Sequence, residues 1–362
     1  MPLRRSLTRY DLSPDQLAEV VEEVAPGAPR YRSTQLWDAL HRRLLEPGEV
    51  SELPRPLRSA LGGHPSMGAA LTLDRLVESD GGLTKKWLWR LADDTRVETV
   101  LMAYPDRSTV CVSTQAGCAM GCTFCATGQA GFDRHLTVGE IVEQVARAAR
   151  SALDDGRHVS RVVFMGMGEP LANYDATWGA VRRLHADLGL SARHLTISTV
   201  GVVPGIRRLA TEDLPVNLAV SLHAANDDKR DGLVPLNRTY PLAQVAAACA
   251  AYLDAKRRRI SFEWALIDGV NDTAADVEEL AAFVRPLRAH VNLIPLNPTP
   301  GYAVLGSSPR RVRWFRDELL ATGVNVTVRQ TRGRDIDAAC GQLAAPTRRR
   351  GMRVPDGASA RL

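Results

Sequence analysis

Short apolar segments rich in β-branched residues alternate with longer segments of helical periodicity through most of the chain. The strand-like segments cover residues 109–113, 161–165, 194–199, 216–221, 260–266, 290–296 and 325–329. Helical spacing is found between them, at 138–153, 174–188, 204–211, 242–255, 274–287 and 309–322. Such alternation predicts βαβ units, a parallel sheet and an α/β fold class. Six or seven repeats exceed a minimal doubly wound sheet, so we expect a partial barrel.

The first part of the chain has a different pattern. Residues from about 12 to 60 are predicted to be helical, with Ser13 and Pro14 opening a helix over 15–24 and a second helix over 33–45. Proline, glycine and serine are frequent between residues 46 and 67, which predicts loops there. We therefore expect residues 1–70 to form a small N-terminal helical domain.

Three more regions follow along the chain. Strand-like segments at 87–91 and 97–104 flank Asp93 and Asp94, which predicts a β-hairpin within a linker region of residues 71–108. The barrel is expected over residues 109–343. Residues 344–362 have no apolar periodicity and are expected to be a basic, disordered tail.

The positive charge of the chain is concentrated near its end. The formal net charge is +5, and from Val326 onward eight arginines face only three aspartates. Clustered arginine suits phosphate binding and favours an RNA or DNA partner. A solvated basic tail is an equally good interpretation of residues 348–353 alone. Aromatic residues make up only 5% of the chain, which argues against a surface rich in base-stacking platforms.

The six cysteines do not have the pattern of a secreted disulfide framework, because four of them lie within fifteen residues of a long chain. No apolar stretch follows the basic N-terminus, so we expect no signal peptide. No run approaches the roughly 18 apolar residues of a membrane span. We expect a cytoplasmic protein, without a membrane partner, whose thiols are kept reduced.

Three cysteines stand in a C-x3-C-x2-C spacing at Cys118, Cys122 and Cys125, with no fourth cysteine close behind them. A [4Fe–4S] cluster is normally held by four thiolates, so three would leave one iron open to an outside ligand. A zinc site completed by a distant histidine or cysteine is the alternative. Zinc ligands usually come as two separated pairs, and no second pair is present. The spacing therefore favours an iron–sulfur cluster.

Polar residues recur where the predicted parallel strands end. The positions are Gly168, Glu169, Ser198, Ser221, Leu222, His223 and Asn297, within or next to Gly-Met-Gly-Glu-Pro, Ser-Leu-His and similar short segments. Catalytic residues of parallel barrels come from this rim. Each residue also has a structural interpretation, as a turn, a helix cap or a packed side chain. Their joint occurrence on one rim predicts a site.

The three remaining cysteines have different surroundings. Cys111 lies at or near the end of the first predicted barrel strand, seven residues before Cys118. Cys340 lies in a glycine-flanked, charged segment near Arg332 and Arg334, where cationic neighbours favour the thiolate. Cys249 lies among alanines on a predicted helix and is interpreted as a core residue.

Several segments together resemble the RlmN family of radical S-adenosylmethionine (SAM) enzymes, the adenine-C2 methyltransferases of 23S rRNA and tRNA. They are the cysteine triplet with Phe124 before its last member, and residues 97–100, 111–115, 164–171, 221–224, 292–295 and 335–343. The resemblance covers residues 31 to 343. It implies a partial (β/α)6 radical SAM barrel and assigns no role to the first thirty residues or the arginine-rich end.

The resemblance also implies cofactors and residue roles. Cys118, Cys122 and Cys125 would hold one [4Fe–4S] cluster, and SAM would bind the open iron and the rim residues. Two SAM molecules would be used per turnover, one to methylate Cys340 and one to yield a 5′-deoxyadenosyl radical. Glu98 would accept the ring proton, and Cys111 would form a transient disulfide with Cys340 that releases the product. Without the resemblance, Glu98 is interpreted as an exposed strand carboxylate.

The implied partners are 23S rRNA, an adenine next to the tRNA anticodon loop, and an electron donor such as flavodoxin or ferredoxin, with the enzyme a monomer. One alternative is the related Cfr enzyme, a carbon-8 adenine methyltransferase that confers ribosomal antibiotic resistance and shares the whole cysteine set. An alternative of another class is a zinc-stabilised RNA-binding protein without catalysis. It would not need Cys111, Cys340 or the rim residues.

Overall fold

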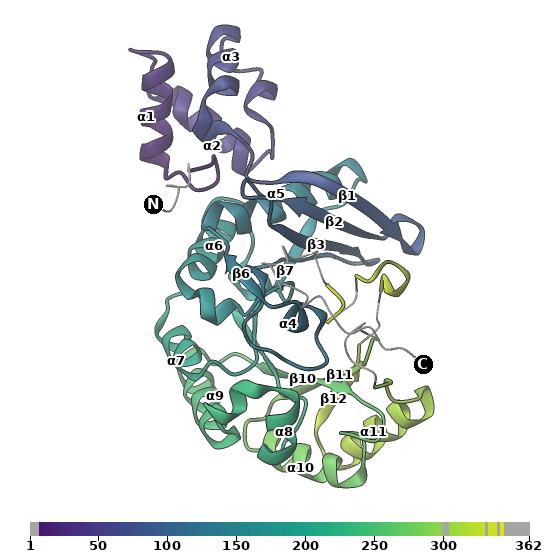
Figure 1. Cartoon of the computed structure of the whole chain (residues 1–362). Helices are drawn as coiled ribbons and strands as arrows, with labels where there is room; N and C mark the ends of the chain where they lie inside the picture. The colour runs from purple at the N-terminus through teal and green to yellow at the C-terminus, as the bar shows by residue number, and fades with distance from the viewer. Residues whose placement is uncertain (1–6, 298, 300–303, 330–331, 339–340, 344–362) are drawn as a thin grey trace, which may run out of the picture.

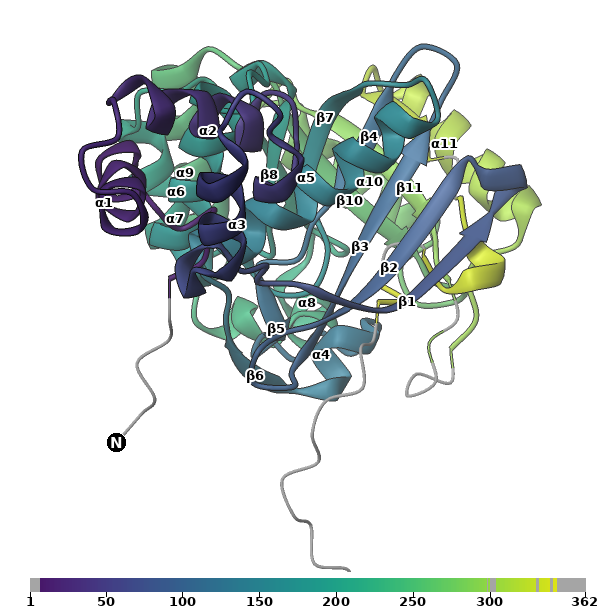
Figure 2. The ribbon, with the colours of Figure 1, turned by 90° about the horizontal axis from the view of Figure 1, so that it is seen from above.

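A computed structural model describes residues 7–297, 299, 304–329, 332–338 and 341–343. In this part of the chain the main sheet has ten strands, in the order β1-β2-β3-β4-β7-β8-β9-β10-β11-β12. Helices cover its convex side, and the sheet curves around an interior (Figures 1 and 2). The predicted tail at 344–362 and Cys340 lie outside the described residues.

The partial barrel consists of parallel strands joined by helices. Its strands are β4 (Ser108–Cys111), β7 (Val159–Phe164), β8 (Leu195–Thr199), β9 (Asn217–Ser221), β10 (Ile260–Leu266), β11 (His290–Pro295) and β12 (Asn325–Val328). The connecting helices are α5 (Val138–Asp154), α6 (Tyr174–Ala186), α7 (Val203–Thr211), α8 (Asp227–Leu233), α9 (Leu242–Lys256), α10 (Ala274–Val284) and α11 (Pro309–Ala321). The predicted alternation is confirmed, with most element ends moved by one to three residues. Helix α8 was not predicted.

Three antiparallel strands extend the barrel at its first edge. They are β1 (Thr72–Ser79), β2 (Thr84–Arg90) and β3 (Arg96–Ala103), and β3 pairs with β4. The predicted hairpin is confirmed as β2 and β3. Strand β1 was not predicted, because it is an exposed edge strand whose Asp74, Arg75 and Glu78 interrupt the apolar alternation. The extension and the barrel strands therefore form one continuous sheet.

The N-terminal helices have a hydrophobic cluster of their own. They are α1 (Pro14–Val24), α2 (Tyr31–His41) and α3 (Arg55–Gly63), and Leu17, Leu36 and Leu61 are buried among them. The prediction of loops throughout 46–67 was wrong, because α3 and the short 3-10 helices η1 (Pro47–Glu49) and η2 (Pro65–Met67) lie there. Proline is compatible with the first turn of a helix. The second helix ends at His41 rather than at residue 45, and Leu44 has a left-handed φ of 57°.

Buried ion pairs join the N-terminal helices to the barrel. Arg9 pairs with Glu46 and, at 3.5 Å, with Glu143 of α5, whose carboxylate also accepts a hydrogen bond from the Ala70 N–H at 2.8 Å. Asp11 accepts a hydrogen bond from the Gly139 N–H at 2.7 Å, at the start of the same helix. These contacts are buried or half-buried, and they fix how the N-terminal helices lie on α5.

A small hairpin carries the cysteine triplet across the carboxyl ends of the barrel strands. It is formed by β5 (Gln115–Gly117) and β6 (Phe132–His135), with α4 (Ala126–Ala130) between them. Among the described residues, we find no helix with the length and apolar character that a bilayer crossing requires.

Candidate active site

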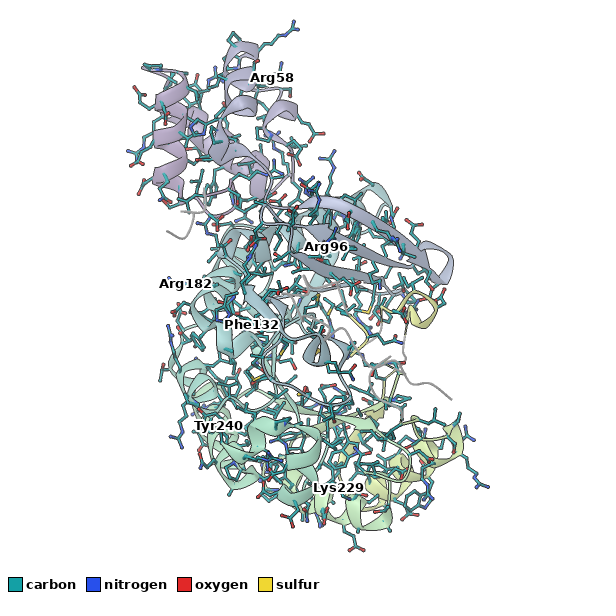
Figure 3. The ribbon with its side chains drawn as sticks, viewed as in Figure 1. Arg58, Arg96, Phe132, Arg182, Lys229 and Tyr240 are labelled. Carbon is teal, nitrogen blue, oxygen red and sulfur yellow. The ribbon has the colours of Figure 1, made fainter. Side chains whose placement is uncertain are left out.

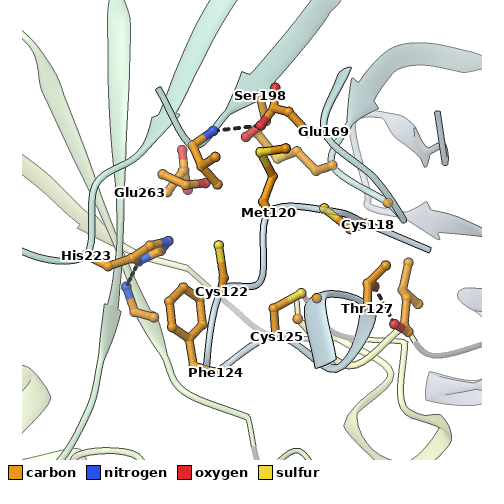
Figure 4. A pocket seen from close by; sticks show the side chains of 18 of the residues that line it. Cys118, Met120, Cys122, Phe124, Cys125, Thr127, Glu169, Ser198, His223 and Glu263 are labelled. Carbon is orange, nitrogen blue, oxygen red and sulfur yellow. Dashed lines mark hydrogen bonds between the residues drawn. The ribbon is translucent and has the colours of Figure 1, made fainter. Parts of the chain in front are cut away.

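The cysteine triplet lies in the loop between β5 and α4, and Figure 4 shows its three sulfur atoms facing one cavity. Gly117 begins the loop with a left-handed φ of 74°, and a Cβ there would lie 2.0 Å from the Gly131 carbonyl oxygen. The Cys118 N–H donates to that same oxygen at 2.7 Å. Only glycine permits this close approach of two backbones. The loop conformation therefore depends on Gly117.

The thiols of this loop fit a cationic iron cluster. Burial raises the pKa of Cys118 to about 12, and burial and the neighbouring thiols raise the pKa of Cys122 as well. Several buried thiolates are stable only beside compensating positive charge. Within the described ranges, no group of three His, Cys, Asp or Glu side chains is placed to hold a single metal ion. Three thiolates on one loop are the kind of donor set that holds an iron–sulfur cluster.

A tight turn after β7 supplies the acidic residue of the site. A Cβ on Gly166 would lie 2.7 Å from the Val112 backbone, and Gly168 has a φ of 100° with Gln115 against it. Glu169 accepts hydrogen bonds from the N–H groups of Leu171 and Val200, both at 2.9 Å. Burial nevertheless raises the pKa of its carboxyl group to about 7. The turn thus holds a carboxyl group at the cavity wall (Figure 4).

His223 is held in the neutral form with one tautomer. Its Nδ1 accepts a hydrogen bond from the Ala265 N–H at 2.9 Å, so the ring proton must be on Nε2. Burial, with the nearby Arg230 charge, lowers the pKa of His223 to about 3. The backbone has a left-handed φ of 60°, and the Asn271 amide donates to its carbonyl at 2.7 Å. A neutral imidazole with a fixed tautomer and orientation therefore lines the cavity.

Arg230, which we did not predict as a site residue, forms hydrogen bonds with the backbone of two rim loops. It is 1% exposed and donates to the carbonyl oxygens of Leu222 at 3.0 Å and Val200 at 2.7 Å. It also donates to the Ser221 carbonyl at 3.2 Å and to Asn237 Oδ1 at 2.8 Å. One guanidinium group thus ties the ends of β8 and β9 together. No sequence motif marks it.

The structure brings most of the predicted site residues to one cavity. Its lining includes Cys118, Cys122, Cys125, Gly168, Glu169, Ser198, Ser221, His223 and Asn297, and also Met120, Phe124, Glu263 and Gly341, which we had not predicted. Leu222 does not line it, because its side chain is fully buried in the core. We call this space, bounded by the cysteine loop and the rim, the cluster pocket.

Glu98 and Cys111 lie outside the lining of the cluster pocket. Glu98 is 6% exposed, with Lys86 Nζ 3.2 Å from Oε1, so the interpretation made without the resemblance, an exposed strand carboxylate, was wrong. It lines a neighbouring cavity together with Asp335 and Asp337. Cys111 is buried at the end of β4, as predicted, and Cys249 is a core residue as predicted.

Residues on both sides of Cys340 are anchored, although Cys340 itself lies outside the described residues. On one side, Lys86 Nζ donates to the Asp337 carbonyl at 3.2 Å. On the other, the Ala126 N–H donates to the Gly341 carbonyl at 2.8 Å, and Thr127 Oγ1 donates to the Leu343 carbonyl at 2.6 Å. The segment is therefore attached both beside Glu98 and beside the cysteine loop.

Comparison with known proteins agrees with this geometry. The family model of the Radical SAM superfamily matches residues 112–284. A crystal structure of a radical SAM methyltransferase from Sphaerobacter thermophilus is 50% identical, covers 93% of this chain and 99% of that one, and superposes with a TM-score of 0.89. Fold and cysteine loop together define the radical SAM class.

Curated relatives identify the family within this class. A probable dual-specificity RNA methyltransferase RlmN from Frankia alni is 50% identical over 98% of this chain and 88% of its own length. Dual-specificity RNA methyltransferase RlmN 1 from Myxococcus xanthus is 49% identical over 98% of both chains. The chain belongs to the RlmN family of radical SAM RNA methyltransferases. These relatives do not favour the Cfr-type alternative or the zinc-stabilised binding protein.

Proposed function

We propose that this protein methylates carbon 2 of an adenine in 23S rRNA and of an adenine next to the anticodon loop of tRNA. The dual-specificity name of its relatives supports both RNA classes. The observation that carries the proposal is the convergence of the cysteine loop, the Glu169 turn, His223 and Asn297 on one cavity. Such a cavity at the carboxyl ends of parallel strands is where barrel enzymes act.

We propose that Cys118, Cys122 and Cys125 hold one [4Fe–4S] cluster whose fourth iron is left for SAM. Gly168, Glu169, Ser198, Ser221, Leu222, His223 and Asn297 are proposed to hold the rest of SAM, Leu222 through its backbone. When bound, the cluster and SAM supply an electron, a methyl group and a carbon radical able to remove hydrogen from an unactivated methyl group. The buried surroundings exclude water from this chemistry.

Two thiols and one carboxylate of the chain are proposed to act on the RNA. Cys340 carries the methyl group as S-methylcysteine and delivers its carbon to the adenine ring. Glu98, buried beside Lys86, accepts the proton that leaves the ring carbon. Cys111, as a thiolate, then attacks the Cys340 sulfur, so that the carbon–sulfur bond breaks, a disulfide forms, and the carbon left on the ring takes up a proton to become the methyl group. The anchoring of Asp337 beside Glu98 and of Leu343 beside the cysteine loop supports a place for Cys340 between the two.

We also propose the division of the chain. Residues 1–70 form an RNA-binding domain, which the separate hydrophobic cluster of α1 to α3 supports as a folding unit. Residues 71–108 form the linker region, 109–343 the barrel with its catalytic loop, and 344–362 a basic tail. We further propose that each turnover uses two SAM molecules and an electron donor such as flavodoxin or ferredoxin. The enzyme is proposed to be a monomer located in the cytoplasm.

Metal content and methyl transfer test the proposal together. The protein purified without oxygen should contain about four irons per chain and should transfer labelled methyl groups from SAM to rRNA and tRNA. Cys118→Ser should lose iron and activity. Zinc in place of iron, or an iron-loaded protein that labels neither RNA, would overturn the proposal.

A further inference from the structure

A second cavity lies inside the barrel, toward the amino-terminal ends of its strands. We call it the amino-terminal cavity; its volume is about 730 Å³. Toward the amino-terminal ends of the strands its lining is polar and consists of Thr109, Arg161, Thr196, Asn217, Ser261 and Asn292, while Met102, Val163 and Val328 line it further along. The interior of a closed parallel barrel is packed at such positions with Val, Ile and Leu. An entire polar layer here indicates a space that receives a polar ligand rather than a packed core.

The charged groups around this cavity include cations that the described residues do not neutralise. Arg161 and Arg193 are exposed, and neither side chain has a hydrogen bond or an ion pair to another residue of the described chain. The two acidic residues of the lining are already engaged. Asp106 pairs with Arg107 at 2.9 Å, and Glu263 accepts hydrogen bonds from Ser261 Oγ at 3.0 Å and Asn292 Nδ2 at 2.9 Å.

The alternation along β7 brings Arg161 to the inner face. Arg161, Val163 and Met165 line the cavity, whereas Val162 between them is fully buried in the core. An arginine at an inward position, without an acidic partner in the described part of the chain, is suited to an anionic ligand, and guanidinium groups bind phosphate with two parallel hydrogen bonds. The cavity is also far larger than one phosphate, which favours a ligand that carries several such groups.

Only a thin wall separates the amino-terminal cavity from the cluster pocket. Met165, Glu263 and Arg329 line both of them, so these three side chains form part of the boundary between the two cavities. An adenine that enters an enclosed site must leave the stack of its neighbours, and its strand stays attached beside it. A cavity that borders the cluster pocket is therefore within reach of phosphates next to the reacting base.

We propose that the amino-terminal cavity binds phosphate groups of the RNA strand next to the target adenine, through Arg161 and Arg193. The inference rests on the proposed function, because it assumes that RNA is the substrate. Phosphate contacts fix the position of a strand without reading its sequence. One cavity of this kind serves both an rRNA and a tRNA, whose flanking bases need not agree.

The test uses the cluster-loaded enzyme carrying both Arg161→Gln and Arg193→Gln, which we call the inner-face variant. Its control carries Arg182→Gln and Arg207→Gln, which remove the same charge from exposed positions on the outer helices α6 and α7 (Arg182 in Figure 3). KM for RNA is measured over a range of salt concentrations. The inner-face variant should raise KM roughly tenfold or more, with kcat within about twofold. The slope of log KM against log salt should fall by about 0.7 per lost phosphate contact.

A second arm uses RNA with neutral methylphosphonate linkages beside the target adenine. These should raise the KM of the wild-type enzyme toward that of the inner-face variant and should have little further effect on that variant. Equal KM values and salt slopes for the inner-face and control variants would overturn the proposal. A wild-type KM that is unchanged by the neutral linkages would overturn it as well.

Titration with inorganic pyrophosphate, followed by calorimetry, separates an RNA site from a small-anion site. Loss of pyrophosphate binding in the inner-face variant, with KM for RNA unchanged, would assign the cavity to a free phosphate compound and refute the RNA inference. A wild-type enzyme that methylates no RNA would instead refute the proposed function itself. The two failures are therefore distinguishable.

Discussion

Replacement of Arg230 by glutamine should destabilise the protein and weaken SAM binding. The guanidinium donates to three carbonyl oxygens and to Asn237, at distances of 2.7 to 3.2 Å. Each acceptor left without a partner in a buried place costs about 1 kcal/mol or more, so four could cost about 4 kcal/mol. Removal of a buried charge offsets part of this, since burial lowers the pKa of Arg230 to about 10.

We therefore expect a net loss on the order of 3 kcal/mol in the free energy of unfolding. Chemical unfolding of the apoprotein in urea measures it, with Arg182→Gln on the outer face of α6 as a control expected within about 0.5 kcal/mol of wild type. The loops after β8 and β9 should loosen, so the Kd for SAM should rise for the cluster-loaded variant. A variant as stable as the control would refute the view that Arg230 holds these loops.

Four further changes have defined outcomes. Cys340→Ala should abolish methylated product in an assay of labelled RNA, because the methyl carrier is lost; wild-type turnover would contradict the mechanism. Cys111→Ala should leave protein covalently attached to RNA on a denaturing gel, and normal release would remove its resolving role. Burial lowers the pKa of His41 from 6.5 to about 4, so the unfolded chain binds more protons than the folded one in that range. The free energy of unfolding should therefore fall as pH drops from 6.5 to 4, by on the order of 3 kcal/mol. His41→Phe should flatten this part of the urea-unfolding pH profile, and an unchanged profile would show that His41 does not titrate this way. Gly166→Ala would place a Cβ 2.7 Å from the Val112 backbone and should weaken SAM binding at least tenfold, whereas an unchanged Kd would show that the turn adapts.

The order of barrel strands and helices could be predicted because their signals are local. Apolar β-branched runs at β7 to β11 become barrel strands in which residues such as Val162, Leu218 and Leu293 are fully buried, and the helical segments between them have one apolar face. Elements whose formation depends on distant partners were missed. Strand β1 pairs only with β2 at an exposed edge, and α3 is a short helix stabilised by the N-terminal cluster.

The site could be predicted where its residues follow strands, since parallel strands bring their carboxyl ends to one rim. Gly168, Ser198 and His223 reach the cluster pocket in this way. Arg230 and Glu263 could not be predicted, because their roles arise from contacts with other strands and loops. The buried environment of Glu98 depends on Lys86 from the neighbouring strand and on residues 335–337, far along the chain.

Methylation at carbon 2 of adenine distinguishes the proposed function from methylation at carbon 8. Mass spectrometry of nucleosides from 23S rRNA and tRNA, after reaction with the cluster-loaded enzyme and SAM, identifies the methylated carbon. We predict 2-methyladenosine from both RNAs, and none with Cys340→Ala. Formation of 8-methyladenosine, or the absence of any methylated adenosine, would contradict the account.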